Sequence, residues 1–130
     1  MIRTKSVYSP ISRKEDGLRI LATRVRGRGL RKNRYDAWMA SLAPSERLLA
    51  AFRRDSMTWA DFSRRYRQEL RDSAAFDQRN RLIKNHGQKF TLRLLQSLAR
   101  RGPVTLMCHC EEDQLQCHRH LLAKVLKGKV

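Results

Sequence analysis

Residues 104–126, VTLMCHCEEDQLQCHRHLLAKVL, decide the fold class of this 130-residue chain. The first five residues, VTLMC, form a short run that is typical of a buried strand, and the apolar residues of HLLAKVL recur at helical spacing. A strand, a loop and a helix in this order make up half of a crossover unit, which joins parallel strands. We therefore expect a sheet that is at least partly parallel.

Two more strands are predicted near the amino terminus, in residues 2–8 (IRTKSVY) and 18–25 (LRILATRV). Both segments are short and either alternate in polarity or are rich in β-branched residues. The residues between them include Pro10 and the pair Asp16-Gly17, which are typical of turns.

The middle of the chain predicts helices. Ser45 is a suitable N-cap for a helix over residues 46–54, and Thr58 caps the next helix, with Asp61 three residues later. In this second helix, aromatic and aliphatic side chains recur every three or four residues, which predicts a buried face rather than a platform for stacking bases. These residues are Trp59, Phe62, Tyr66 and Leu70.

Residues 74–102 continue the helical pattern, with an expected interruption at His86-Gly87 and an end at Gly102-Pro103. Four residues predict a second apolar face: Phe90, Leu94, Leu95 and Leu98. Strands, then helices, then a strand and a helix indicate an α/β protein with a small mixed or parallel sheet covered by helices. The length predicts a single domain over residues 1–130.

The charge of the chain points to polyanionic partners. Lys and Arg number 29 against 12 Asp and Glu, which gives a formal net charge of +17. Gly27 and Gly29 predict an irregular loop that is the most densely positive segment. Its cations are Arg24, Arg26, Arg28, Arg31, Lys32 and Arg34. Nucleic acid is the first partner to consider for such a field.

No segment approaches the roughly 18 consecutive apolar residues that a membrane span needs, and the amino terminus lacks the apolar core of a signal peptide. We therefore expect a soluble, cytoplasmic protein with no membrane partner. Three cysteines cannot all pair within one chain, and Cys108 and Cys110 are only two residues apart, so we expect reduced thiols.

The order of several short motifs resembles the YeaO-like family, a domain of unknown function of the DUF488 class. The motifs are DGLRILATR (16–24), RGL (28–30), DAWMASLAPS (36–45), the spaced W, F, RY and EL of residues 59–70, GPVTL (102–106) and a histidine-containing stretch before the last helix. The resemblance covers residues 7–126 and implies a compact α/β domain without an assigned activity. The pattern maps onto Asp16, Gly17, Arg19, Arg24, Arg28, Gly29, Asp36, Trp38, Pro44, Ser45, Trp59, Phe62, Tyr66 and His118.

The chain departs from the family pattern in its basic loop. Where many relatives carry an Asp-Arg-Leu-Trp-Pro-Arg-Gly run, this chain has TRVRGRG, so that Thr23 replaces Asp, Arg26 replaces Trp and Gly27 replaces Pro. The loss of the carboxylate puts in doubt any acid or base role of this segment. The cysteine-bearing CHC and CHRH resemble the wider family, in which some branches carry Cys-His-Arg at this helix start.

Zinc binding is one interpretation of residues 108–120. Cys108, Cys110 and Cys117, with either His118 or His120, would supply four ligands of the kinds that tetrahedral zinc sites use. Cys108 and Cys110 share one face at the end of a strand, whereas structural zinc sites usually place two ligands two to four residues apart around a turn. We expect no cofactor, and zinc is the one alternative that these residues allow.

An enzyme is the second interpretation. The loop after the strand 104–108 lies where open α/β sheets bind ligands, and the first turn of the next helix favours an anion. Arg119 would hold a phosphate there. The same field lowers the pKa of a thiol, so Cys110 and Cys117 are candidate nucleophiles, with His118 placed for proton transfer.

The acidic residues of the same loop count against a phosphate site. Phosphatase and sulfurtransferase loops place an arginine on the same tight loop as the nucleophilic cysteine, whereas this loop carries Glu111, Glu112 and Asp113. These carboxylates would repel a phosphate. A third interpretation is that the cysteines are unreactive thiols buried at a strand-to-helix turn.

We also expect the basic loop 24–34 and the turn 109–119 to flank one cleft, where Arg24, Arg28 and Arg119 would bind an anion. The leading hypothesis is a basic α/β protein that binds a polyanionic or phosphate-bearing partner, above all nucleic acid. An enzyme that acts on a phosphorylated or anionic substrate is the alternative. A zinc-stabilised structural module is the third hypothesis.

Overall fold

The computed structural model describes residues 1–72 and 87–130. Within these residues, four strands form one parallel sheet in the order β1-β4-β2-β3. The strands are β1 (Ile2–Ser6), β2 (Leu18–Leu21), β3 (Ala37–Trp38) and β4 (Val104–Cys108). The predicted α/β class is confirmed, and the sheet is wholly parallel.

Strand β4 lies in the centre of the sheet. Val104 at its start is in register with Ile2 of β1 on one side and with Leu18 of β2 on the other. All five residues of β4 are buried, because helices cover one face of the sheet and loops cover the other. A parallel strand that is buried on both faces explains the continuous VTLMC run in the sequence.

The described helices are α1 (Arg13–Asp16), α2 (Glu46–Arg53), α3 (Trp59–Arg71), α4 (Lys89–Arg101) and α5 (His118–Lys127), with short 3-10 turns at Lys32–Arg34 and Ala40–Leu42. Both predicted N-caps are confirmed. The Ser45 hydroxyl accepts the Leu48 N–H at 3.2 Å, and the Thr58 hydroxyl accepts the Asp61 N–H at 3.1 Å.

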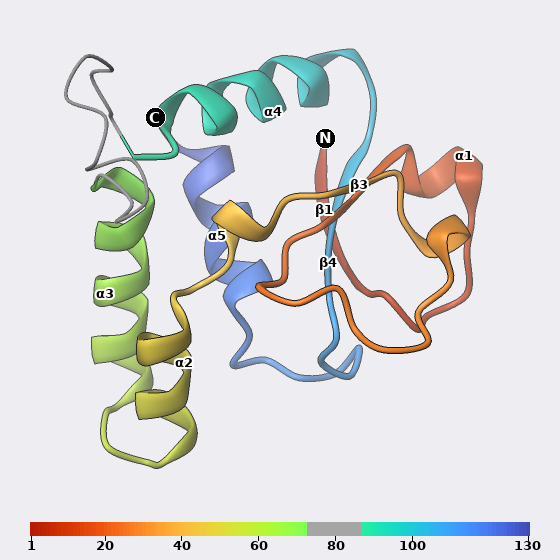
Figure 1. Ribbon diagram of the computed structural model, residues 1–130. Helices are drawn as coiled ribbons and strands as arrows, with labels where there is room; N and C mark the ends of the chain where they lie inside the picture. Colours follow the sequence, from red (N-terminus) through yellow and green to blue (C-terminus); the bar gives the residue numbers. More distant parts are fainter. Residues whose placement is uncertain (73–86) are drawn as a thin grey trace, which may run out of the picture.

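The main core lies between the sheet and the helices α3, α4 and α5, which gather on one side of the strands (Figure 1). Phe62, Tyr66 and Leu70 of α3 are buried there, as the spacing predicted, and Trp59 packs partly buried against them. A smaller core on the opposite face joins Val7, Leu21, Leu30 and Met107, with Tyr35 packed against it.

The structure corrects the predicted apolar face of α4. Phe90 and Leu94 are exposed, at 62% and 54%, whereas Leu92 and Leu95 are buried against the core. Helix α4 carries more apolar residues than one helix face can hold, and tertiary packing determines which of them are buried. The helical pattern predicted for residues 74–86, including His86, lies outside the described residues.

Two short elements of the structure, α1 and β3, were not predicted from the sequence. Helix α1 occupies the segment predicted as a turn, and β3 extends the sheet at the end of the predicted loop by pairing Ala37 and Trp38 with β2. Elements of four and two residues carry too little periodicity to be detected in a sequence. No helix in the described ranges is long and apolar enough to cross a membrane.

Candidate functional site

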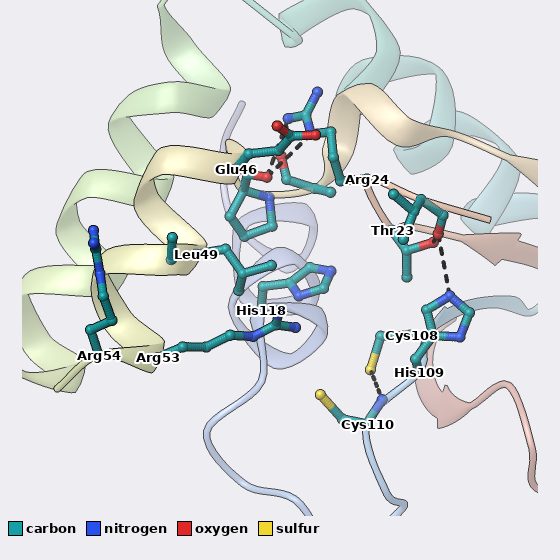
Figure 2. Close-up of a pocket in the computed structure, with 14 residues that line it drawn as sticks. Thr23, Arg24, Glu46, Leu49, Arg53, Arg54, Cys108, His109, Cys110 and His118 are labelled. Carbon is teal, nitrogen blue, oxygen red and sulfur yellow. Dashed lines mark hydrogen bonds between the residues drawn. The ribbon is translucent and has the colours of Figure 1, made fainter. Parts of the chain in front are cut away.

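A pocket of about 450 Å³ lies at the carboxyl ends of β2 and β4, the edge at which parallel α/β sheets bind ligands. Its walls come from four segments: Thr23–Val25 after β2, residues 43–54 around α2, Cys108–Cys110 at the end of β4, and His118 on α5 (Figure 2). Its volume lies within the range of small-molecule sites.

Three cysteine sulfurs meet beside this pocket, and two of the cysteines, Cys108 and Cys110, line it. The Sγ atoms of Cys108, Cys110 and Cys117, called the thiol cluster below, lie within 4.8 Å of one another. Cys108 and Cys117 are buried, with their sulfurs 3.0 Å apart, whereas Cys110 is half-buried and lines the pocket. The end of β4 and the first residue before α5 bring these side chains together.

Arg119 fixes the turn that carries the cluster. Its side chain is 0% exposed, and its guanidinium donates to the carbonyl oxygens of Cys110, Glu111 and Glu112 at 2.9–3.3 Å. Nη1 also donates to Cys108 Sγ at 3.0 Å. Among the described residues, Arg119 Nε has no hydrogen-bond partner. Arg119 therefore lies beneath the pocket and positions its floor.

His118 is held in one orientation. Its Nε2 lies 2.5 Å from the Ala22 carbonyl oxygen, which can only accept, so that Nε2 carries the proton. Its Nδ1 lies 4.0 Å from Cys117 Sγ, and the edge of the ring meets Tyr66. Burial lowers the pKa of His118, although the Ala22 hydrogen bond opposes this effect. The imidazole is therefore neutral near pH 7.

The thiol cluster holds negative charge readily. Hydrogen bonds from the Cys108 and Cys117 thiols lower the pKa of Cys110 to about 2, and the Arg119 guanidinium adds to this effect. The hydrogen bond to Cys110 raises the pKa of Cys108, although the bond from Cys117 opposes it, and hydrogen bonds to Cys108 and Cys110 raise the pKa of Cys117, because a thiol that donates must keep its proton. The cluster therefore favours a thiolate at Cys110, with the protons kept by Cys108 and Cys117.

Cations surround the mouth of the pocket. Arg24 donates to the Ala43 and Pro44 carbonyls at 3.0 and 3.3 Å, which joins the loop after β2 to the start of α2. Arg53 and Arg54, at the end of α2, are exposed, and the Arg53 side chain points toward His118 in Figure 2. Among the described lining residues, Glu46 is the one carboxylate.

His109 joins the basic loop to the turn after β4. Its Nε2 lies 3.2 Å from the Val25 carbonyl oxygen, and its Nδ1 lies 3.2 Å from the Tyr8 hydroxyl. Gly27 has a φ of 98°, and a Cβ at this position would lie 2.6 Å from the His109 ring. A glycine is therefore required at residue 27 for this ring to pack against the loop.

A family model described as the active DUF488-N3 subclade, DUF488-N3a, matches residues 2–130. The chain belongs to this family. It is 30% identical over 130 residues to an uncharacterized protein, Rv3073c, of Mycobacterium tuberculosis, covering 98% of this chain and 95% of that protein. It is also 34% identical over 98 residues to the uncharacterized protein YeaO of Escherichia coli, covering 74% and 82% respectively. No solved structure matches the chain.

Most residues that match the YeaO-like pattern stabilise the DUF488 fold rather than line the pocket. The buried Arg19 donates to Asp36 at 3.3 Å, and the buried Asp16 accepts from Lys5 at 2.9 Å. The Tyr66 hydroxyl donates to the Leu42 carbonyl at 2.6 Å. Matching residues that do line the pocket are Arg24, Pro44 and His118.

The departures from the DUF488 pattern have local structural roles. The Thr23 hydroxyl donates to the Val25 carbonyl at 2.6 Å, and Arg26 donates to the Tyr35 hydroxyl at 2.5 Å and lies over its ring. No carboxylate stands at residue 23 to act as an acid or base. The glycine at residue 27 provides space for His109, as described above.

The structure brings together part of the predicted site. Cys108, Cys110 and Cys117 lie together, His118 is beside them rather than His120, and Arg24 lines the same pocket. Arg28 is exposed and does not line the pocket, whereas Arg119 is buried beneath it. These two arginines therefore do not converge with Arg24 in the pocket.

Two cations of the pocket, Arg53 and Arg54, were not among the site residues predicted from the sequence. On a predicted amphipathic helix, arginines at its end resemble any solvated surface, and no local signal distinguishes them. Their place beside the cysteines depends on how α2 packs.

Proposed function

We propose that this protein binds nucleic acid, with a phosphate group held at the mouth of the pocket. The observation that carries the proposal is the set of arginines, Arg24, Arg53 and Arg54, around a pocket at the carboxyl edge of the sheet. The net charge of +17 supplies the long-range attraction for a polyanion. The free thiols fit a reducing compartment, and we propose the cytoplasm.

The test compares two pairs of exposed arginines. Arg53→Gln/Arg54→Gln removes charge at the pocket, and Arg65→Gln/Arg67→Gln removes the same charge from the exposed surface of α3. Fluorescence anisotropy with labelled single-stranded DNA, single-stranded RNA and duplex DNA measures the affinity over a range of salt concentrations. All proteins are compared after circular dichroism shows native helix content.

The pocket pair should weaken binding about tenfold and reduce the slope of log affinity against log salt by about two, since two phosphate contacts are lost. The control pair should weaken binding by only about twofold. Equal losses in both pairs would show diffuse attraction to the whole surface and would contradict a binding site at the pocket.

A second candidate function rests on the position of one sulfur. Cys110 and His118 line the pocket, and Cys117 is buried beside them. A thiol enzyme that acts on an anionic substrate is therefore the alternative. In native, metal-free protein, one thiol should then react with iodoacetamide much faster than a free cysteine does. Cys110→Ser should abolish this fast reaction. Slow, uniform reaction of all three thiols would exclude this alternative.

A further inference from the structure

We propose that the thiol cluster and His118 form a binding site for a thiophilic divalent metal ion, with Zn²⁺ as the ion that the ligand set favours. Three thiolates and one imidazole are a donor set that tetrahedral zinc sites use, whereas magnesium and calcium take oxygen ligands. This inference goes beyond the proposed nucleic-acid binding and does not depend on it.

The sulfur positions are the first argument. The three Sγ atoms lie within 4.8 Å of one another, so small side-chain shifts suffice to bring all of them to the Zn–S distance of about 2.3 Å from one central ion. Cys108 and Cys117 are buried, so their sulfurs are held by the fold rather than by solvent. Cys110 and His118 border the pocket, which gives an ion a path to the site.

Hydrogen bonds to Cys108 provide the second argument. Its sulfur accepts the backbone N–H of Cys110 at 3.3 Å and Nη1–H of Arg119 at 3.0 Å. Two donors aimed at one buried sulfur would stabilise the thiolate that a bound metal requires. Such contacts orient a ligand and stabilise its charge once a metal is bound.

The fixed tautomer of His118 is the third argument. Because Nε2–H is donated to the Ala22 carbonyl, Nδ1 keeps its lone pair on the side that faces Cys117. Metal-ligating histidines commonly donate their other N–H to a carbonyl or carboxylate in this way. His120 is engaged elsewhere, with Nε2 near the Gln114 carbonyl and Nδ1 near Thr4, so His118 is the fourth ligand.

Charge compensation completes the argument. Arg119 is fully buried, and its nearest carboxylate, Glu112, is half-exposed, 3.9 Å away and also hydrogen-bonded to Ser6 and Ser9. Three thiolates, one divalent cation and one guanidinium sum to zero net charge, which is the arrangement that a buried site requires. Metal binding would release the thiol protons to solvent.

The experiment titrates the reduced full-length chain with Co²⁺, a spectroscopic substitute for Zn²⁺, and then competes the bound Co²⁺ with Zn²⁺. One equivalent should produce a sulfur-to-metal charge-transfer band and the intense visible absorption of tetrahedral Co²⁺, and Zn²⁺ should remove both. Bound Zn²⁺ should also protect three thiols from iodoacetamide.

Variants at ligands and at their neighbours test the assignment. Cys110→Ser should weaken the metal affinity at least about tenfold, and His118→Asn should change the visible spectrum while the charge-transfer band remains. His120→Asn is the matched control and should leave spectrum and affinity within about twofold. Circular dichroism of each metal-free variant verifies that it is folded.

Two outcomes would overturn the site: no spectral change on Co²⁺ addition to folded, fully reduced protein, or a spectrum that Cys110→Ser leaves unaltered. In the first case, one rapidly alkylated thiol would instead support the enzyme alternative. Salt-dependent binding of nucleic acid is measured separately, so the failure of either proposal leaves the other standing.

Discussion

Arg19 and Arg119 are both buried arginines next to the sheet, but their positive charges are compensated in different ways. Arg19, 6% exposed, donates to both carboxylate oxygens of Asp36 and to the Asn33 carbonyl. Arg119, 0% exposed, donates to three carbonyls and to a cysteine sulfur, and its closest carboxylate is 3.9 Å away. The charge of Arg19 is compensated by a carboxylate of the fold itself, whereas the charge of Arg119 would be compensated by negative charge on the thiol cluster.

The largest effect should follow the loss of Arg119. Arg119→Met removes the hydrogen bonds that the guanidinium donates to the carbonyls of residues 110–112, so the free energy of unfolding should fall by about 3–5 kcal/mol. Urea denaturation measures this change. Arg119→Lys keeps the charge but not the forked geometry and should lose less. A loss below about 1 kcal/mol for Arg119→Met would show that the turn is held by other contacts.

Arg19→Met should have a smaller effect, about 1–3 kcal/mol, because the Asp36 side chain is 41% exposed and water can replace part of the lost interaction. The same denaturation experiment applies. The double variant Arg19→Met/Asp36→Asn should cost less than the sum of the two single changes, since the two side chains interact directly. Strict additivity would mean that the pair contributes no coupling.

The two regions should also differ in their response to acid. Burial raises the pKa of Asp16 and of Asp36, but hydrogen bonds to Lys5 and Ser12, and to Arg19, outweigh this and lower both below 3.8. The folded state therefore binds fewer protons, and stability should fall as the pH drops through 3.8 toward the lowered values. Thermal unfolding measured between neutral pH and pH 3 gives this slope.

The variant Asp36→Asn should be less stable than the parent at pH 7 and should show a flatter slope at acid pH, because one titrating group is gone. Arg119→Met, which alters no aspartate, should keep the slope of the parent. An unchanged slope in Asp36→Asn would show that the Arg19 region does not cause the loss of stability in acid.

The smallest effect should come from Arg28→Ala. Arg28 is exposed and lies outside the pocket lining, so the free energy of unfolding should change by less than about 0.5 kcal/mol. Binding of nucleic acid should weaken no more than for the control pair Arg65→Gln/Arg67→Gln. A tenfold loss of nucleic-acid affinity would show that Arg28 contributes to the binding site and that this site includes the basic loop.

Local patterns in the sequence were sufficient for the elements with clear periodicity or caps. The VTLMC strand, the Ser45 and Thr58 caps and the buried face of α3 depend on residues near one another in the chain. The exposure of Phe90 and Leu94 depends on packing instead, and their predicted burial was wrong.

The candidate site likewise contains residues that were predictable from the sequence and residues that were not. The cysteines and His118 are clustered in the sequence and therefore attract attention as a set. The burial of Arg119 was not predictable, because an arginine at a helix start resembles an exposed anion ligand until the three carbonyls around it are known. The contribution of α2 to the pocket likewise depends on tertiary packing alone.

The central position of β4 has a consequence for synthesis of the chain on the ribosome. β1 and β2 both pair with a strand that begins at residue 104, and they do not pair with each other. A nascent chain that ends before this strand has no shared partner for them, so the sheet can close only after residues 104–108 have been synthesised. Until then, β1 and β2 have unpaired edges, which are open to pairing with other chains.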